Sequence, residues 1–268
     1  MQHHIYSDTN MDAPEFITAA HGQVGIFSAR SPDEGHPSNE DAAAVFTIDD
    51  DKAVLALADG VGGIRGGELA SSIAIQQLQS ALGNGILEVN SLRSCILDAF
   101  ENANKKVVET GLGAATTFAV VEIDSGMIRP YHAGDSEILA VGSRGKLKLH
   151  TVSHSPVGYA VESGVMDARE AMEHDERHIV SNVVGDADMR IEVGPSLTLA
   201  RQDTVILASD GLTDNLHTNE IIEMIRKNSL QSVMQQLAAE TSRRMLDFNG
   251  DHPSKPDDVT FLIYRRTA

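Results

Sequence analysis

The chain has 268 residues, of which 41% are hydrophobic and 22% charged, so it can bury a sizeable core and is not a disordered chain. Asp and Glu number 39 against 21 Lys and Arg, and the net charge of -18 argues against nucleic acid or an anionic membrane as a partner. The single cysteine, Cys95, excludes an intrachain disulfide and a cysteine-based zinc cluster. No apolar run approaches the ~18 residues of a membrane helix, and the first eight residues lack the pattern of a secretory signal. We therefore expect a cytoplasmic protein.

The predicted elements come in blocks of strands and pairs of helices. Residues 1–18 show no periodicity and are expected to form a flexible N-terminal leader. Short runs of small and β-branched residues predict strands at 23–29, 43–48, 53–58, 116–123, 127–132, 137–141, 146–150, 196–200, 204–208 and 258–265. Apolar residues at helical spacing predict helices at 69–82, 92–111, 219–227 and 230–246.

A polar stretch at residues 153–185 interrupts the strands. We interpret it as a surface flap that holds at most one short helix, near residues 167–172. The spacing of His154, His174 and His178 is too irregular for a metal site, so we expect them on the surface of the flap.

This order of elements does not alternate as βαβ units would. We predict an α+β fold, in which an antiparallel β-sandwich is flanked by pairs of antiparallel helices in a four-layer αββα arrangement. Because no repeat or linker is evident, we expect residues 19–268 to form a single domain that includes the flap.

Acidic residues recur where the predicted strands begin or end. A strand end fixes a carboxylate at the rim of a sheet, and a neighbouring glycine lets backbone and ligand approach closely. An isolated Asp-Gly pair is most often only a turn. Converging carboxylates would repel one another unless cations neutralise them, and an all-oxygen ligand set suits Mg²⁺ or Mn²⁺. The motifs are Ser38-Asn39-Glu40-Asp41, Ala58-Asp59-Gly60-Val61-Gly62-Gly63, Ala114-Ala115-Thr116-Thr117, Ala133-Gly134-Asp135-Ser136, Ser209-Asp210-Gly211-Leu212-Thr213-Asp214 and Asp257-Asp258-Val259-Thr260.

In order and spacing these motifs resemble those of the metal-dependent protein phosphatases of the PPM (type 2C) family, in particular its bacterial branch. The resemblance covers residues 21–266, and the β-sandwich of that family agrees with the layers predicted above. It implies a metal site made by Glu40, Asp41, Asp59, Gly60, Asp135, Asp210, Asp214 and Asp257, with Asp59, Asp210 and Asp257 as the catalytic residues.

The resemblance also implies a role for each of these residues. Asp59 would bridge two metal ions, Asp210 and Asp257 would hold the first ion, and the carbonyl of Gly60 would bind the second. Glu40 would bind the second ion directly or through water, with Asp41 as a supporting neighbour. A third, weaker metal site would use Asp135 and Asp214 and would share Asp210.

The activity implied is the hydrolysis of phosphoserine and phosphothreonine in proteins. Two Mn²⁺ or Mg²⁺ ions would share and activate a water that attacks phosphorus directly, without a covalent phosphoenzyme. The implied partners are phosphorylated proteins, opposite a Ser/Thr kinase, and we expect a monomer that binds neither nucleic acid nor membrane.

Some positions depart from the family pattern. Many members carry an arginine that grips the substrate phosphate three residues before the position of Asn39, where this chain has His36. A protonated imidazole can bind phosphate, although without the planar fork of arginine. We expect His36 to bind the substrate phosphate, with a solvated loop histidine as the alternative and Arg30 as a possible substitute. Val61 stands where eukaryotic members have a proposed general acid, and Glu137 stands where an arginine is common.

Two other functions compete with this interpretation. A catalytically weak pseudophosphatase could act as a phosphoprotein-binding module, but such proteins lose metal ligands, and Asp59, Asp210 and Asp257 are all present. A haloacid-dehalogenase-type phosphotransferase also uses Asp and Mg²⁺. It would need an Asp-x-Asp motif, which neither Asp59-Gly60-Val61 nor Asp210-Gly211-Leu212 supplies.

Overall fold

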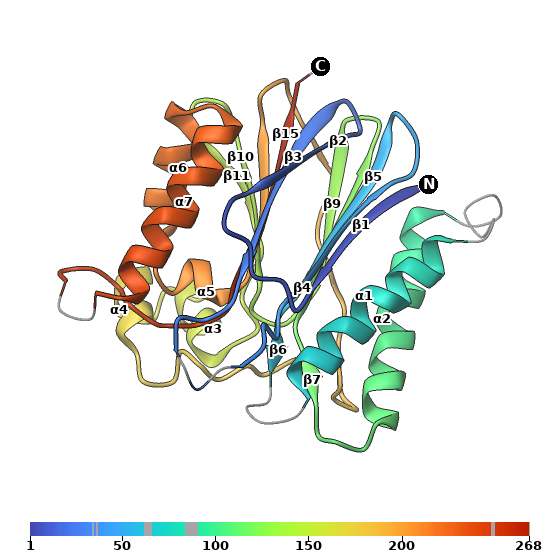
Figure 1. Cartoon of the computed structure of the whole chain (residues 1–268), viewed down its shortest axis with the longest axis horizontal. Helices are drawn as coiled ribbons and strands as arrows, with labels where there is room; N and C mark the ends of the chain where they lie inside the picture. Colours follow the sequence, from blue (N-terminus) through green and yellow to red (C-terminus); the bar gives the residue numbers. More distant parts are fainter. Residues whose placement is uncertain (34, 36, 62–65, 84–90, 248–249, 268) are drawn as a thin grey trace.

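Two antiparallel sheets pack face to face, and a pair of helices covers the outer face of each sheet (Figure 1). The computed structural model describes residues 1–33, 35, 37–61, 66–83, 91–247 and 250–267. The four layers confirm the predicted α+β sandwich.

The first sheet has the strand order β1-β4-β5-β8-β9-β12, and β13 also pairs with β9. Its strands are β1 Gln2–Ser7, β4 Ala42–Thr47, β5 Lys52–Ala58, β8 Phe118–Asp124, β9 Met127–Ala133, β12 Glu192–Val193 and β13 Leu197–Thr198. The second sheet has the order β11-β10-β14-β15-β3-β2. Its strands are β2 Glu15–Ala19, β3 Gly22–Ala29, β10 Glu137–Val141, β11 Leu147–His150, β14 Thr204–Ala208 and β15 Val259–Arg266. A small ladder joins β6 Gly60–Val61 to β7 Ala115–Thr116.

The helices fall into an outer pair on each sheet and short helices near one end of the sandwich (Figure 1). One outer pair is α1 Gly67–Leu82 and α2 Leu92–Glu109, and the other is α6 Thr218–Lys227 and α7 Leu230–Met245. The short helices are α3 Pro156–Glu162, α4 Ala168–Glu173 and α5 Asp210–Thr213. Among the described helices, none has both the length and the apolar character needed to cross a bilayer.

The central strands are apolar along their whole length because both of their faces are covered. In β4, Ala42, Ala44 and Phe46 face the α1–α2 layer, whereas Ala43 and Val45 face the other sheet, and all of them are buried. Successive side chains of a strand point to opposite faces, so a strand between two apolar layers needs apolar residues at every position.

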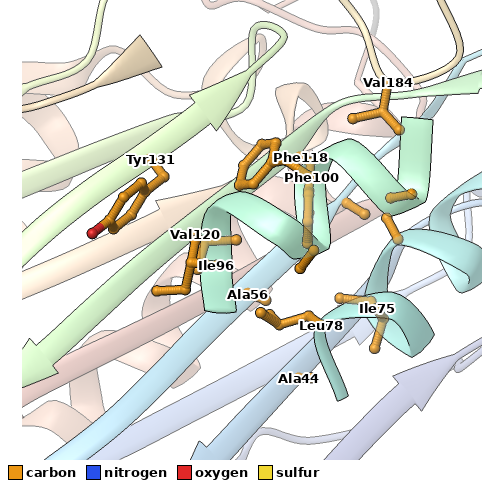
Figure 2. Close-up of a cluster of buried hydrophobic side chains, with 14 of the residues drawn as sticks. Ala44, Ala56, Ile75, Leu78, Ile96, Phe100, Phe118, Val120, Tyr131 and Val184 are labelled. Atoms are coloured by element: carbon orange, nitrogen blue, oxygen red, sulfur yellow. The ribbon is translucent and has the colours of Figure 1, made fainter. Parts of the chain in front are cut away.

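The layer between the first sheet and helices α1 and α2 is held by large side chains, as Figure 2 shows. Phe100 of α2 packs on Phe118 of β8 with ring centroids 4.4 Å apart. Burying a side chain of this size contributes roughly 1.5–3 kcal/mol. Cys95 lies in the same cluster and is fully buried.

The prediction of a flexible leader at residues 1–18 was wrong. Strand β1 pairs with β4 along its whole length, from Gln2 opposite Thr47 to Ser7 opposite Ala42, and β2 pairs with β3. Most side chains of β1 are exposed because it is an edge strand, so its sequence carries little of the apolar alternation that predicts a strand.

The flap at residues 153–185 holds two short helices, α3 and α4, although the sequence predicted at most one. The missed helix, α3, begins after Ser155, whose side chain accepts a hydrogen bond from the Gly158 N–H, and has Pro156 in its first turn. Both features are typical of a helix start, but the helix is too short for its apolar pattern to be recognised.

Candidate active site

Asp41 and Asp59 lie side by side at one end of the first sheet. Ala42, the first residue of β4, pairs with Ala58, the last residue of β5, so the residue before one strand and the residue after the other meet at the same edge. The N–H of Asp59 donates to Thr117 Oγ1 at 3.0 Å, and its carbonyl accepts from the Thr117 N–H at 2.8 Å. These bonds fix the backbone of Asp59 at the rim of the sheet.

Asp210 and Asp257 occupy the corresponding edge of the second sheet. Ala208, the last residue of β14, pairs with Phe261 of β15. Asp210, two residues after β14, therefore lies near Asp257, two residues before β15. Asp210 is the first residue of α5, where a carboxylate is favourable.

Asp135 joins the two edges because it lies in the turn between β9 of the first sheet and β10 of the second. Its neighbour Ser136 forms a hydroxyl–hydroxyl hydrogen bond of 2.6 Å with Thr117, the residue that holds Asp59. The carboxylates predicted at separate strand ends are therefore brought to one end of the sandwich.

A second hydrogen-bond network ties the sheets together behind these acids. Ser209 Oγ donates to Asp41 Oδ2 at 2.9 Å. The carboxylate of Asp258 accepts from the Glu40 N–H at 2.7 Å and from the Ser31 N–H at 2.7 Å. Asp258 is thus a structural acid that positions the Glu40–Asp41 segment, a role that sequence analysis missed.

Gly60 lies where backbone segments approach too closely for a side chain. A Cβ at this position would lie 2.4 Å from the Gly67 carbonyl carbon and 2.7 Å from the Glu40 carbonyl oxygen. The side chain of Glu40 also lies against Gly67, where a Cβ would be 2.7 Å from its Oε2. Because Gly60 and Gly67 have no Cβ, the Gly60 backbone and the Glu40 carboxylate can lie close together beside Asp59.

The acids lie close enough together to raise one another's pKa values. Burial, followed by the charges of Asp41, Asp210, Asp135 and Asp257, raises the pKa of Asp59 well above its ordinary value. Like charges that are close together in a partly dry site disfavour ionisation, and a bound cation would relieve this cost.

Other acids of the cluster shift in the same direction. Burial and the charge of Asp258 raise the pKa of Asp41, although hydrogen bonds from Thr260 and Ser209 oppose the shift. Burial and Asp210 raise the pKa of Asp135 to about 7, and the same two causes raise that of Asp257 to about 6.

Lys255 supplies positive charge to this cluster, and sequence analysis did not single it out. Its Nζ lies 2.5 Å from Asp210 Oδ2, 2.9 Å from Asp214 Oδ2 and 3.0 Å from Asp257 Oδ2. Burial would lower the pKa of the Lys255 ammonium, but the three carboxylates raise it well above its ordinary value. A lone lysine in a polar segment has no spacing signal that would have predicted these contacts.

A cavity of about 470 Å³ opens between the acids and the flap. Asp135, Asp210 and Asp214 line one side of it. Its other walls include apolar and cationic side chains of the flap, among them Val157, Val161, Met172, Arg169 and Arg177. The cavity combines an acidic floor with an apolar rim, which suits an extended peptide that carries a phosphate.

The position expected to grip the substrate phosphate, His36, lies outside the described residues, so its role stays a prediction. Arg30, considered as a substitute, donates from Nη1 to the Pro37 carbonyl at 2.8 Å and so supports the loop that leads to the Asn39 motif. Glu137 pairs with His150 at 2.8 Å, a local ion pair at the start of β10.

The expectation that His154 lies on the flap surface was wrong. His154 is 4% exposed, and its ring stacks on that of His132 with centroids 4.3 Å apart. Its Nδ1 accepts from the Gly134 N–H at 3.1 Å, and its Nε2 lies 3.1 Å from Glu192. One potential ligand atom from each of His132, His154 and Glu192 lies within 4.8 Å of the others. Both ring nitrogens of His154 already have hydrogen-bond partners, Gly134 and Glu192, which accounts for its buried position without an ion.

The aspartate cluster, in contrast, fits a hard divalent cation. Its donors are carboxylate oxygens, the ligands that Mg²⁺ and Mn²⁺ prefer. The Oδ2 atom of Asp214 is buried and lies 2.9 Å from the Lys255 ammonium. A buried carboxylate of this kind needs a cation beside it, either an ammonium or a metal ion.

Comparison with known proteins agrees with this fold. The family model of protein phosphatase 2C matches residues 33–248. The protein phosphatase PhpP of Streptococcus pneumoniae is 29% identical over 197 residues, which cover 70% of this chain and 78% of that protein. The serine/threonine phosphatase of S. agalactiae has a solved structure with a TM-score of 0.76 and 26% identity, covering 91% of this chain and 99% of that one.

A further solved structure has the same fold at lower identity. The catalytic domain of the serine/threonine protein phosphatase PstP, in complex with two manganese ions, has a TM-score of 0.71 and 22% identity, covering 90% of this chain and 96% of that one. Because the family model spans most of the chain, this protein belongs to the protein phosphatase 2C family, as the resemblance of its motifs implied.

Proposed function

We propose that this protein hydrolyses phosphoserine and phosphothreonine in other proteins with the help of Mn²⁺ or Mg²⁺. The observation that carries the proposal is the convergence of Asp41, Asp59, Asp135, Asp210 and Asp257 from both sheets in a chain of the protein phosphatase 2C family. Clustered carboxylates of this kind need cations to neutralise them, and divalent cations also favour transfer of a charged phosphoryl group.

The proposed metal ligands are those implied by the sequence motifs: Glu40, Asp41, Asp59, Gly60, Asp135, Asp210, Asp214 and Asp257. When bound, the ions would lower the pKa of an attacking water and neutralise charge on the phosphoryl oxygens. The chain's own contribution is to hold the acids rigidly: Thr117 fixes the backbone of Asp59, and Ser209 orients the carboxylate of Asp41.

The substrate would enter the cavity beside the flap. Val157, Val161 and Met172 line the same cavity as Asp135 and Asp210 and offer apolar contacts to the residues around a phosphorylated side chain. His36 is proposed to bind the phosphate from the loop that precedes Asn39. We further propose a monomer in the cytoplasm that opposes a Ser/Thr kinase and binds neither nucleic acid nor membrane. The net charge of -18 supports the last point.

The test is hydrolysis of a phosphothreonine peptide and of p-nitrophenyl phosphate with Mn²⁺ and with EDTA. Asp210→Ala should lower kcat by at least about 100-fold, because it removes a proposed ligand of the first metal ion. Asp50→Ala makes the same change in charge in the exposed turn between β4 and β5, at the opposite end of the sheet, and should leave kcat unchanged. Hydrolysis that persists in EDTA or in Asp210→Ala would contradict the proposal. If no metal tested supports hydrolysis, the proposal is also wrong and a pseudophosphatase is favoured.

A further inference from the structure

Hydrogen bonds to the buried side chain of Asn215 fix the backbone of Lys255, and these bonds do not involve the acids. Its backbone N–H donates to Asn215 Oδ1 at 2.9 Å, and its carbonyl accepts from Asn215 Nδ2 at 2.8 Å. Asn215 is fully buried, and its own carbonyl accepts from Arg244 of α7 at 2.8 Å. The backbone of Lys255 is thus fixed to the helical layer before its side chain reaches the acids.

The ammonium of Lys255 then lies among carboxylates in the way that a small cation would. It lies within 3.0 Å of one oxygen, Oδ2, of each of Asp210, Asp214 and Asp257. An ammonium has three N–H donors and no acceptor, so it can satisfy several carboxylates at once. The lysine side chain is 21% exposed, so solvent screens these contacts only in part.

Two of these three aspartates, Asp210 and Asp214, belong to the set proposed for a third metal ion. A metal ion binds carboxylate oxygens at about 2.0–2.6 Å, so an ion bound to the oxygens that Lys255 contacts would lie within a few ångströms of its Nζ. Two cations at that distance repel each other strongly in a poorly solvated site. The ammonium and a third ion therefore compete for the same carboxylates.

We infer that Lys255 is a tethered cation that takes the place of the third metal ion, so that this phosphatase works with two divalent ions and one lysine. The inference rests on the proposed metal site. Lys255 contacts one oxygen of Asp210 and one of Asp257, so the other oxygen of each aspartate is not part of these contacts and can serve the first ion. On this inference Asp214 leaves the proposed set of metal ligands and acts as a counter-charge to Lys255.

The experiment counts bound Mn²⁺ by equilibrium dialysis with elemental analysis and measures affinities by titration calorimetry. Wild type should bind two ions. Lys255→Gln should bind a third ion, or bind its weakest ion at least about 10-fold more tightly, because the competing charge is gone. Lys255→Arg keeps the charge and should behave as wild type, and the double variant Lys255→Gln with Asp214→Asn should lose the gain.

Lys227→Gln is the matched control, since among the described residues this exposed lysine of α6 forms an ion pair with Glu223 alone and its loss should not alter Mn²⁺ binding. Asp214→Asn alone keeps Lys255 and tests the same point even if Lys255→Gln does not fold. The inference predicts that this variant still binds two ions, whereas a fall from three ions to two would overturn it.

If a folded Lys255→Gln variant binds the same number of Mn²⁺ ions with the same affinity as wild type, the inference is also overturned. The proposed function would remain intact in that case, provided that wild type binds two ions. A wild-type protein that binds no Mn²⁺ would instead overturn the proposed metal site, and the inference with it.

Discussion

At the scale of single residues, the site depends on close approach as much as on charge. Asp59 is fixed through its backbone by Thr117, and Gly60 beside it lies against the backbone of Glu40 and Gly67. The aspartate supplies the charge, whereas the glycine sets how near the neighbouring segments can come. An Asp-Gly pair in a simple turn would have no such neighbours.

Gly60→Ala tests this close packing. The added methyl would lie 2.4 Å from the Gly67 carbonyl carbon, so backbone has to move, at a cost of about 1–3 kcal/mol or more. We expect a lower midpoint in urea unfolding and weaker Mn²⁺ binding by calorimetry. Gly142→Ala, where the nearest atom is Cε of the flexible Lys148 side chain at 3.2 Å, is the control and should change neither. Equal behaviour of the two variants would show that the corner at Gly60 is not rigid.

At the scale of the elements, the N-terminal strand supports the site, although the sequence predicted a flexible leader there. Tyr6 of β1 is buried in the layer between the sheets and donates to Glu15 at 2.9 Å. Just after β1, Asp8 accepts from the Asn39 N–H at 3.1 Å, and the Thr9 carbonyl accepts from Asn39 Nδ2 at 2.7 Å. The segment after β1 therefore positions the residue next to Glu40.

Deletion of residues 1–9 should weaken both the fold and the metal site. Loss of Tyr6 burial alone removes roughly 1.5–3 kcal/mol, which corresponds to a fall in Tm of about 3 °C or more in a domain of this size. Mn²⁺ affinity should fall as well, because Asn39 loses both contacts. Differential scanning fluorimetry and calorimetry give the two readouts, and His4→Ala, an exposed position of β1, is the control. Full stability and affinity in the truncated protein would restore the prediction of a leader.

At the scale of the whole molecule, the fold places mutually repelling carboxylates at one end of the sandwich. The pKa of Asp135 is raised to about 7 and that of Asp257 to about 6, mainly by burial and the charge of Asp210. A carboxyl group whose folded pKa lies above its unfolded pKa favours the fold at low pH, and this contribution is lost as the pH rises through the folded value.

The metal-free protein should therefore lose stability between about pH 4 and pH 7. One pKa unit corresponds to about 1.4 kcal/mol, but solvent screens these partly exposed carboxylates, so the full sum of the shifts is not reached. We expect a loss on the order of 2–4 kcal/mol, measured by urea unfolding in EDTA at several pH values. Asp135→Asn removes one of the charges and should flatten this dependence, whereas Asp50→Asn in an exposed turn should not. A wild-type stability that rises over this range, or the same slope in Asp135→Asn, would contradict the account.

The layers of the fold and the acids of the site could be predicted because each has a strong local pattern. Strands such as β4 and β5 are covered on both faces and read as apolar runs, and the aspartates follow or precede these runs directly. Edge strand β1 and helix α3 were missed because one is mostly exposed and the other is a single short segment. The contacts of Lys255 with Asp210, Asp214 and Asn215 join segments that are 40 or more positions apart, and no local pattern records them.

The most direct test of the central claim, that the aspartates of both sheets form one metal centre, is a crystal soaked in Mn²⁺ and measured at an anomalous wavelength. We predict paired anomalous peaks at the end of the sandwich, with Asp59 between them and Asp210 and Asp257 in contact with one of the two. Peaks only at His132, His154 and Glu192, or no peak beside Asp59, would contradict it.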